Sequence, residues 1–280
     1  MDWLYWHDGE WREEEQMLLG LKDNSFWMGN SVFDGARVVE DLAPDLDLHC
    51  ARAIVSAERM LMKPKISAEE LTNICREGAK KFPKGTPLYV RPMFYARDGF
   101  LVPDPDSTEC AICIFELPMP FENGMTAAIS PYKRPASDMA PTDAKASCHY
   151  PNMQRAIVWA KEKGVDTALV LNPDGTIGEF ASANIFIVSR GRILTPEPNG
   201  SILNGLTRQR VIQLLRDDGF EIIETSLTAS DVYQADEVFC TGNHVKVAPV
   251  IKIDECTYPN GEVSQRARKL YWDFASTQPL

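Results

Sequence analysis

Short strand-like runs recur along almost the whole chain, and few helical segments interrupt them. Runs rich in β-branched and aromatic residues, with turn residues beside them, predict strands at 89–95, 126–130, 167–171, 184–188, 192–195, 221–225 and 237–241. Apolar residues at helical spacing predict helices at about 152–163 and 208–217, each followed by a glycine. Strands interleaved with so few helices favour an α+β fold.

One proline-rich segment divides this pattern into two parts. Residues 117–124 read Leu-Pro-Met-Pro-Phe-Glu-Asn-Gly, a composition typical of a connection between elements. A chain of 280 residues is long enough for two modest domains. The sequence therefore predicts two lobes with a cleft at the connection: an N-terminal α/β domain at 1–118, a linker at 119–124 and a larger domain at 125–280.

The composition is that of a globular chain and excludes several classes of partner. With 44% hydrophobic and 25% charged residues, the chain is not expected to be disordered. Its 29 Lys and Arg against 40 Asp and Glu give a net charge of −11, which argues against nucleic acid or an anionic membrane as partner. No apolar run approaches the roughly 18 residues of a membrane span. Seven scattered cysteines without a secretory signal indicate reduced thiols and a cytoplasmic protein. The histidines show no ligand spacing, so we expect no metal site, and His7 is expected to be a surface residue.

Lys145 is the strongest candidate for chemistry. It lies in the run Pro-Thr-Asp-Ala-Lys-Ala-Ser-Cys-His-Tyr at 141–150, where small residues flank it. A lysine that must reach a carbonyl group needs neighbours that leave room, and surroundings that lower its pKa let it act as nucleophile and base. A lone lysine is usually solvated, so the assignment depends on other segments.

Short segments around the lysine resemble the fold-type IV aminotransferases, which use pyridoxal 5′-phosphate (PLP). The branched-chain amino acid aminotransferases are the family that the chain resembles most. The resemblance covers nearly the whole chain, because the matching segments follow in the same order and spacing at 31–37, 49–57, 89–92, 167–175, 178–188, 203–208 and 239–243. It implies the two-lobed α+β fold of D-amino acid aminotransferase, with a small N-terminal α/β lobe and a larger lobe built on a β-barrel-like sheet.

The resemblance implies roles for the residues around the cofactor ring. Lys145 would form an aldimine with PLP and, once displaced by the substrate amine, move a proton at the substrate Cα. Glu179, with Asn184 shortly after it, corresponds to the carboxylate that keeps the pyridine nitrogen protonated. By itself Glu179 could equally be an acid in a turn. Tyr150 corresponds to the tyrosine that hydrogen-bonds the phenolic oxygen of the cofactor, although it could also be a half-buried core residue.

The cofactor phosphate would be bound by several groups. Leu206 and Thr207 begin a helix whose free N–H groups and dipole suit a dianion, and Thr207 would also be the N-cap of that helix. The resemblance adds further phosphate ligands: Arg52, Thr241, Gly242 and Asn243.

The residues expected to contact the substrate depart in part from the branched-chain pattern. They are Met28, Phe33, Tyr89, Arg91, Asn243 and His244. Met28 stands where those enzymes have a tyrosine, and Asn243 with His244 replaces a threonine followed by a small residue. Arg91 on its strand could bind a distal carboxylate such as that of glutamate, or it could form an ion pair within its own lobe.

The sequence thus predicts a PLP-dependent aminotransferase. It would move an amino group from a branched-chain or other apolar amino acid to a 2-oxo acid through pyridoxamine phosphate. Three alternatives stay open: an R-selective amine or D-amino acid transaminase, favoured by the departures at the pocket; an aminodeoxychorismate-type lyase of the same fold; and a non-catalytic PLP-binding homologue. The resemblance also implies at least a homodimer, in agreement with the aromatic residues gathered near 26–33.

Overall fold

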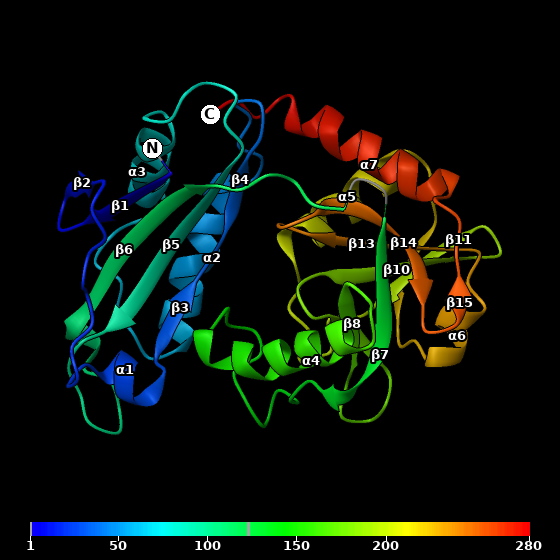
Figure 1. Cartoon of the computed structure of the whole chain (residues 1–280), viewed down its shortest axis with the longest axis horizontal. Helices are drawn as coiled ribbons and strands as arrows, with labels where there is room; N and C mark the ends of the chain where they lie inside the picture. The colour runs from blue at the N-terminus through cyan, green and yellow to red at the C-terminus, as the bar shows by residue number, and fades with distance from the viewer. Residues whose placement is uncertain (1, 122–123) are drawn as a thin grey trace. The chain divides into compact units, whose positions relative to one another are not determined.

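The computed structural model describes residues 2–121 and 124–280, which divide into two compact units (Figure 1). Unit 1 comprises the described residues of Met1–Pro118 together with Ala144–His149 and Ala275–Leu280. Unit 2 comprises the described residues of Met119–Asp143 together with Tyr150–Phe274. The predicted domains were continuous in sequence, whereas the segment around Lys145 groups with unit 1 and the chain on both sides of it with unit 2. Residues 122 and 123 of the predicted linker lie outside the described residues.

Unit 1 is built on a six-stranded sheet with helices packed against it. Its strands follow the order β2-β1-β6-β5-β3, and β4 also pairs with β5. The strands are β1 Trp3–His7, β2 Glu10–Arg12, β3 Ser31–Phe33, β4 Ala36–Val38, β5 Leu88–Ala96 and β6 Thr108–Glu116. The helices are α1 Asn24–Met28, α2 Leu46–Arg59, α3 Ala68–Ala79 and the short η1 Pro105–Ser107 and η2 Ser147–His149. Because α2 and α3 contact each other and β5, their buried faces form the core of this unit.

Unit 2 is built on a nine-stranded sheet in the order β12-β11-β10-β13-β14-β7-β8-β9, with β15 paired to β14. The strands are β7 Met125–Lys133, β8 Thr167–Leu171, β9 Ile177–Phe180, β10 Asn184–Ser189, β11 Arg192–Pro196, β12 Ile222–Thr225, β13 Glu237–Gly242, β14 Lys246–Ile253 and β15 Cys256–Thr257. The helices are α4 Tyr150–Glu162, α5 Leu206–Asp217, α6 Ala229–Tyr233 and α7 Glu262–Ala275. The edge strand β9 contacts β10 and β11, so the sheet curls on itself. The predicted α+β class with a barrel-like second sheet is confirmed.

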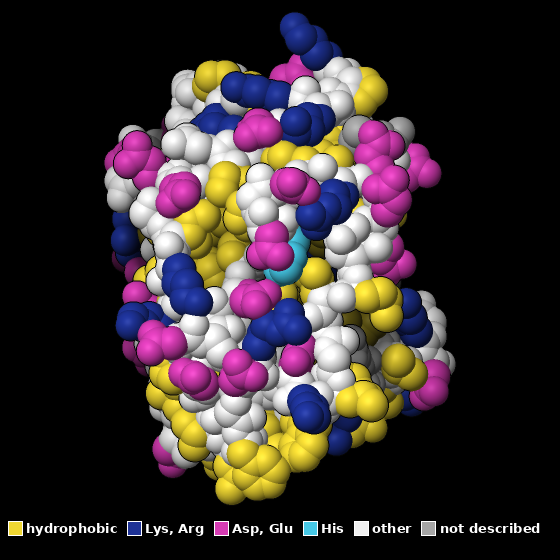
Figure 2. All heavy atoms as spheres, turned by 90° about the vertical axis from the view of Figure 1, so that its left-hand side faces the viewer, with side chains coloured by type: hydrophobic (Ala, Val, Ile, Leu, Met, Phe, Trp, Pro, Cys, Tyr) yellow, Lys and Arg dark blue, Asp and Glu magenta, His cyan; other side chains and the backbone are white. Residues whose placement is uncertain are grey.

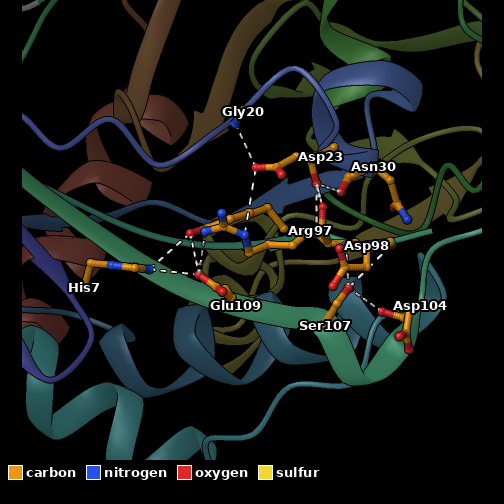
Figure 3. A network of polar contacts seen from close by, with 12 residues as sticks. His7, Gly20, Asp23, Asn30, Arg97, Asp98, Asp104, Ser107 and Glu109 are labelled. Carbon is orange, nitrogen blue, oxygen red and sulfur yellow. Dashed lines mark hydrogen bonds and ion pairs between the residues drawn. The ribbon is translucent and has the colours of Figure 1, made fainter. Parts of the chain in front are cut away.

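A polar network lies on the sheet of unit 1, next to the chain that leads into α1 (Figure 3). The Glu109 carboxylate lies 2.9 Å from His7 Nε2 and accepts a 2.9 Å hydrogen bond from the Tyr95 hydroxyl. Burial alone would raise the pKa of Glu109, but those two hydrogen bonds and the charge of Arg97 hold it below its usual value. The Asn24 N–H donates to the Arg97 carbonyl at 2.8 Å. His7 is therefore a buried part of this network, and its expected surface position is wrong.

Acidic and basic side chains are interspersed over the face of unit 1 drawn in Figure 2. Hydrophobic side chains gather at the lower end of that face, where Figure 1 draws α1. Exposed large apolar side chains of this region are Phe26, Trp27, Met28, Phe100, Leu101 and Val102. The described residues include no helix that is long and apolar enough to cross a membrane. The cytoplasmic location stays a prediction.

Candidate active site

Lys145 is held by its backbone against β3 and α2. Its N–H donates to Ser56 Oγ at 3.1 Å, and its carbonyl accepts from the Phe33 N–H at 3.2 Å. The next residue, Ala146, forms an isolated antiparallel bridge with Val32 of β3. The alanines at 144 and 146 are buried, while Lys145 itself is half-buried. Its side chain therefore leaves a fixed backbone with small neighbours, as the sequence predicted.

The Lys145 side chain and a second cation lie near the same aromatic ring in unit 1. Lys145 Nζ lies 5.1 Å from the centre of the Phe33 ring, and the Arg91 guanidinium lies 4.8 Å from the same centre. Arg91 is also 5.3 Å from the Tyr89 ring. A Cβ at Gly35 would lie 2.0 Å from the Tyr89 hydroxyl, so only glycine fits there. Buried Arg91 Nε has no acceptor among the described residues.

The other predicted residues of unit 1 have different surroundings. Arg52 on α2 makes a two-pronged ion pair with Asp34, Nε to Oδ2 at 2.6 Å and Nη2 to Oδ1 at 2.8 Å. His49 Nδ1 lies 2.6 Å from the same Oδ1. Burial alone would raise the pKa of Asp34, but the charges and hydrogen bonds of Arg52 and His49 outweigh burial and hold it well below its usual range. Met28 ends α1 and is exposed.

Glu179 on β9 is buried and fixed by two partners of unit 2. Its Oε1 pairs with Arg134 Nη1, and its Oε2 accepts from Asn184 Nδ2 at 3.0 Å. The same Asn184 Nδ2 donates to the Leu203 carbonyl at 2.9 Å. The Arg134 guanidinium supplies the counter-charge that a buried carboxylate requires. Glu179 is thus an oriented carboxylate rather than a solvated acid in a turn.

The segment before α5 approaches Asn184 closely. A Cβ at Gly205 would lie 2.3 Å from Asn184 Oδ1, so the N-cap position of α5 requires glycine. Gly205 is therefore the N-cap, and the expectation that Thr207 caps the helix is wrong. Leu206 and Thr207 are its first two helical residues, whose N–H groups have no acceptor within a helix.

The end of β13 and the turn that follows it hold two buried polar atoms without partners. Thr241 is paired with Asn184 of β10 in the sheet, and its Oγ1 has no hydrogen-bond partner among the described residues. Buried Asn243 Nδ2 also has none. Gly242 lies between them, and His244 follows, with its ring 6.4 Å from the Phe121 ring. Buried polar atoms in native proteins are nearly always satisfied, so these two point to a ligand.

The structure groups the predicted residues by unit. In unit 1, the residues brought together are Lys145, Phe33, Tyr89 and Arg91. The Arg52 cluster, which consists of Arg52, Asp34 and His49, also belongs to this unit. In unit 2, the residues brought together are Glu179, Asn184, Thr241 and the start of α5. Tyr150 is the first residue of α4 in unit 2. Sequence reasoning gave no role to Arg134, Ser56 or Asp34. The last two stood inside matching segments, whereas Arg134 gave no local signal. Among the described residues, no group of three or more His, Cys, Asp or Glu could hold a metal ion.

A family model decides the classification. The model described as "Amino-transferase class IV" matches residues 31–253. The chain belongs to the class IV aminotransferase family. Within the family, a curated relative is the probable branched-chain-amino-acid aminotransferase of Aquifex aeolicus, 31% identical over 96% of this chain and 90% of the relative. The branched-chain-amino-acid aminotransferase of Pseudomonas aeruginosa is 29% identical over 98% of this chain and 94% of the relative.

Solved structures of family members have the same fold. An aminotransferase from Brucella abortus bound to the co-factor PLP superposes with a TM-score of 0.96 at 43% identity, covering 99% of this chain and 100% of that one. The branched-chain aminotransferase of Thermoproteus uzoniensis with norvaline gives a TM-score of 0.90 at 30% identity, covering 98% and 95%. The resemblance inferred from the sequence segments, the fold-type IV architecture and the aminotransferase class are confirmed.

Proposed function

We propose that this class IV aminotransferase uses PLP to move an amino group from a branched-chain or other apolar L-amino acid to a 2-oxo acid. The observation that carries the proposal is Lys145, which is fixed through Ser56 and Phe33 in a chain that matches solved aminotransferases over nearly its whole length. The solved relative from Brucella abortus is bound to PLP, and the one from Thermoproteus uzoniensis to norvaline, an unbranched apolar amino acid.

The residues of unit 2 fit the charged parts of this cofactor. Thr241 Oγ1 and Asn243 Nδ2 are buried polar atoms without partners, and a phosphate would supply the acceptors that both lack. Helix α5 begins at Leu206, shortly after the Leu203 carbonyl that Asn184 contacts. The free N–H groups of its first turn, including those of Leu206 and Thr207, suit the same dianion. Glu179, held by Arg134 and Asn184, would take the ring nitrogen. Arg52, Tyr150 and Gly242 stay predicted cofactor contacts.

The residues of this chain divide the chemical work. The cofactor, when bound, supplies a carbonyl for the amine and an electron-withdrawing ring. Lys145 Nζ would be the nucleophile toward that carbonyl and the base for the proton at the substrate Cα. Glu179 would keep the ring nitrogen protonated, and Arg134 holds the Glu179 carboxylate in place. One lysine thus performs both covalent and general-base steps.

The surroundings of Phe33 support an apolar substrate with a carboxylate acceptor. The Phe33 and Tyr89 rings offer apolar surface, and Met28 is proposed to add to it. Arg91 contacts both rings, and its buried Nε has no acceptor among the described residues, so it suits the distal carboxylate of 2-oxoglutarate. Asn243 and His244 are proposed to lie at the α-carboxylate.

We infer a homodimer from the exposed apolar residues of unit 1. Trp27 and Phe100 are both more than half exposed, and their rings lie 5.5 Å apart edge to face. Apolar patches of this kind mark interfaces, where aromatic residues and Met are enriched. Trp27→Asp with Phe100→Asp should give monomers in light scattering, whereas Val158→Asp, at an exposed apolar position of unit 2, should not. An unchanged mass for the double variant would exclude this surface.

Substrate turnover tests the proposed function. L-Valine, L-leucine and L-isoleucine with 2-oxoglutarate should react at least tenfold faster than D-amino acids or (R)-amines. Lys145→Ala should abolish turnover and the visible absorbance of the bound cofactor, while Lys161→Ala, at an exposed lysine of α4, should leave both unchanged. Faster turnover of (R)-amines or D-amino acids would establish the first alternative. Release of pyruvate from aminodeoxychorismate without a 2-oxo acid would establish the lyase.

A further inference from the structure

A fully buried lysine lies at the end of the β13–β14 turn. Lys246, the first residue of β14, has an exposed fraction of 0%. Lysine is almost never fully buried, because its ammonium must be desolvated. Lys246 also has a backbone φ of 57°, a left-handed conformation that L-residues adopt at a cost. Two unfavourable features at one residue of the proposed phosphate site require an explanation.

The ammonium of Lys246 determines which way the Asn243 amide points. Lys246 Nζ lies 2.8 Å from Asn243 Oδ1. An ammonium can only donate a hydrogen bond, so the atom that it contacts must be the amide oxygen. The two ends of an asparagine amide are otherwise hard to tell apart, but here the lysine fixes the assignment. Asn243 Nδ2 is consequently directed away from Lys246 as a donor, and this is the buried atom without an acceptor.

The same turn is connected to the start of α5 within unit 2. Thr241 pairs with Asn184 across β13 and β10, and Asn184 Nδ2 donates to the carbonyl of Leu203 shortly before α5. Helix α5 also packs against β13. The Thr241 hydroxyl lies on a strand that contacts α5, and the Asn243 amide follows two residues later; both are donors without acceptors, which suits an anion.

We propose that Lys246 is a positioning residue for the cofactor phosphate, an inference that rests on the proposed function. Its hydrogen bond holds the Asn243 amide so that Nδ2 donates to a phosphate oxygen. A purely structural role would instead use the lysine for its packing, since Nζ also lies 5.6 Å from the Tyr271 ring. If Lys246 positions Asn243 for the phosphate, its loss weakens the binding of a ligand only when that ligand carries a phosphate. If Lys246 serves only for packing, its loss affects ligands with and without a phosphate equally.

These roles can be separated by comparing two ligands, PLP and pyridoxal, which lacks the phosphate. The Kd of each is measured on the whole chain after removal of the cofactor. Lys246→Met should raise the Kd for PLP about tenfold, the loss of roughly one charge-assisted hydrogen bond, and leave the Kd for pyridoxal within about twofold. Lys246→Gln, whose amide can still donate to Asn243 Oδ1, should recover part of the PLP affinity. Lys252→Met, on the same strand with a side chain 41% exposed, is the matched control and should change neither Kd.

Asn243→Asp provides the test that does not depend on removing a buried lysine. Aspartate keeps an oxygen for Lys246 and can form an ion pair with it, so the protein should fold with an unchanged or higher Tm. It replaces the Nδ2 donor with a second acceptor, so the Kd for PLP should rise about 100-fold while the Kd for pyridoxal stays unchanged.

In the Asn243→Ala background, Lys246→Met should add less than about threefold to the Kd for PLP, because the lysine acts mainly through the amide. Equal losses of PLP and pyridoxal affinity in Lys246→Met and Asn243→Asp would overturn the inference and leave the proposed function standing. Wild-type protein that binds PLP no better than pyridoxal would instead contradict the proposed phosphate site as a whole.

Discussion

Two regions expected to bind the cofactor phosphate differ in whether their hydrogen bonds are already made. On α2 of unit 1, both prongs of Arg52 are taken by the Asp34 carboxylate, which His49 also contacts. In the β13–β14 turn of unit 2, Thr241 Oγ1 and Asn243 Nδ2 are buried without partners. Within the Arg52 cluster, Asp34 already engages Nε and Nη2 of the arginine, whereas the two polar atoms of unit 2 would gain partners only from a ligand.

This difference separates groups that stabilise the fold from groups that bind. A side chain whose polar atoms are satisfied within the protein should matter chiefly for stability, and its loss should be visible without ligand. An unsatisfied buried donor should matter chiefly for affinity, because the protein without ligand already lacks the bond. Substitutions in the two regions should therefore change different measurements.

The largest effect on stability is expected from Asp34→Asn. The asparagine would leave the half-buried Arg52 guanidinium without its anion and would turn an amide N–H toward it. Breaking one partner of a buried pair lowers the free energy of unfolding by about 3–5 kcal/mol. Urea unfolding of the cofactor-free protein checks this, with the exposed Asp138→Asn as control. A loss below about 1 kcal/mol would show that the cluster does not stabilise unit 1.

The pH dependence of stability should come from the same carboxylate. The native pKa of Asp34 is lowered, so its contribution is fully present above the unfolded pKa of about 4 and is lost as the pH falls toward the native pKa. The difference in unfolding free energy between wild type and Asp34→Asn should thus shrink as the pH falls below about 4. A difference that grows in acid would contradict the lowered pKa.

Local patterns were sufficient to predict most elements and the class of enzyme. Strands β8, β10, β11 and β13 and helices α4 and α5 form close to the expected residues, because each has its own apolar pattern and turn residues. Lys145 was identifiable because small residues flank it and matching segments follow it. The chemistry depends on which side chains stand in the matching segments, so the resemblance of these segments predicted the function as well as the fold.

Contacts between residues that lie far apart in sequence could not be predicted from local patterns. The bridge from Ala146 to Val32 places the Lys145 segment in unit 1, and the two residues are far apart in sequence. The role of Arg134 could not be predicted, because its partner Glu179 lies on β9, far along the sequence. Lys246 was missed for a physical reason: a lone lysine is expected to be solvated, and only the fold shows that this one is buried.

The turn of unit 2 gives the third prediction, with a smaller effect on a different measurement. Thr241→Val keeps the shape of the side chain and removes the unpartnered hydroxyl. The Kd for PLP should rise about tenfold, because a hydrogen bond to a charged group is lost, and Tm without cofactor should not fall. Titration of the cofactor-free protein and a melting curve check both. A lower Tm with an unchanged Kd would place this residue with the Arg52 cluster.

The smallest effect is expected from Arg37→Met, which extends the comparison to a buried cation in unit 1. Arg37 has an exposed fraction of 0%, and it donates to the Leu117 carbonyl. Its Nε and Nη1 have no acceptor among the described residues, and burial lowers the pKa of Arg37 to about 10. Replacing a poorly compensated buried charge by an apolar side chain of similar length is often neutral or stabilising. The free energy of unfolding should therefore stay the same or rise by about 1 kcal/mol in urea titration. A fall of more than about 2 kcal/mol would show that the hydrogen bond to the Leu117 carbonyl outweighs the cost of burying the charge, so that Arg37 stabilises unit 1 as Asp34 does.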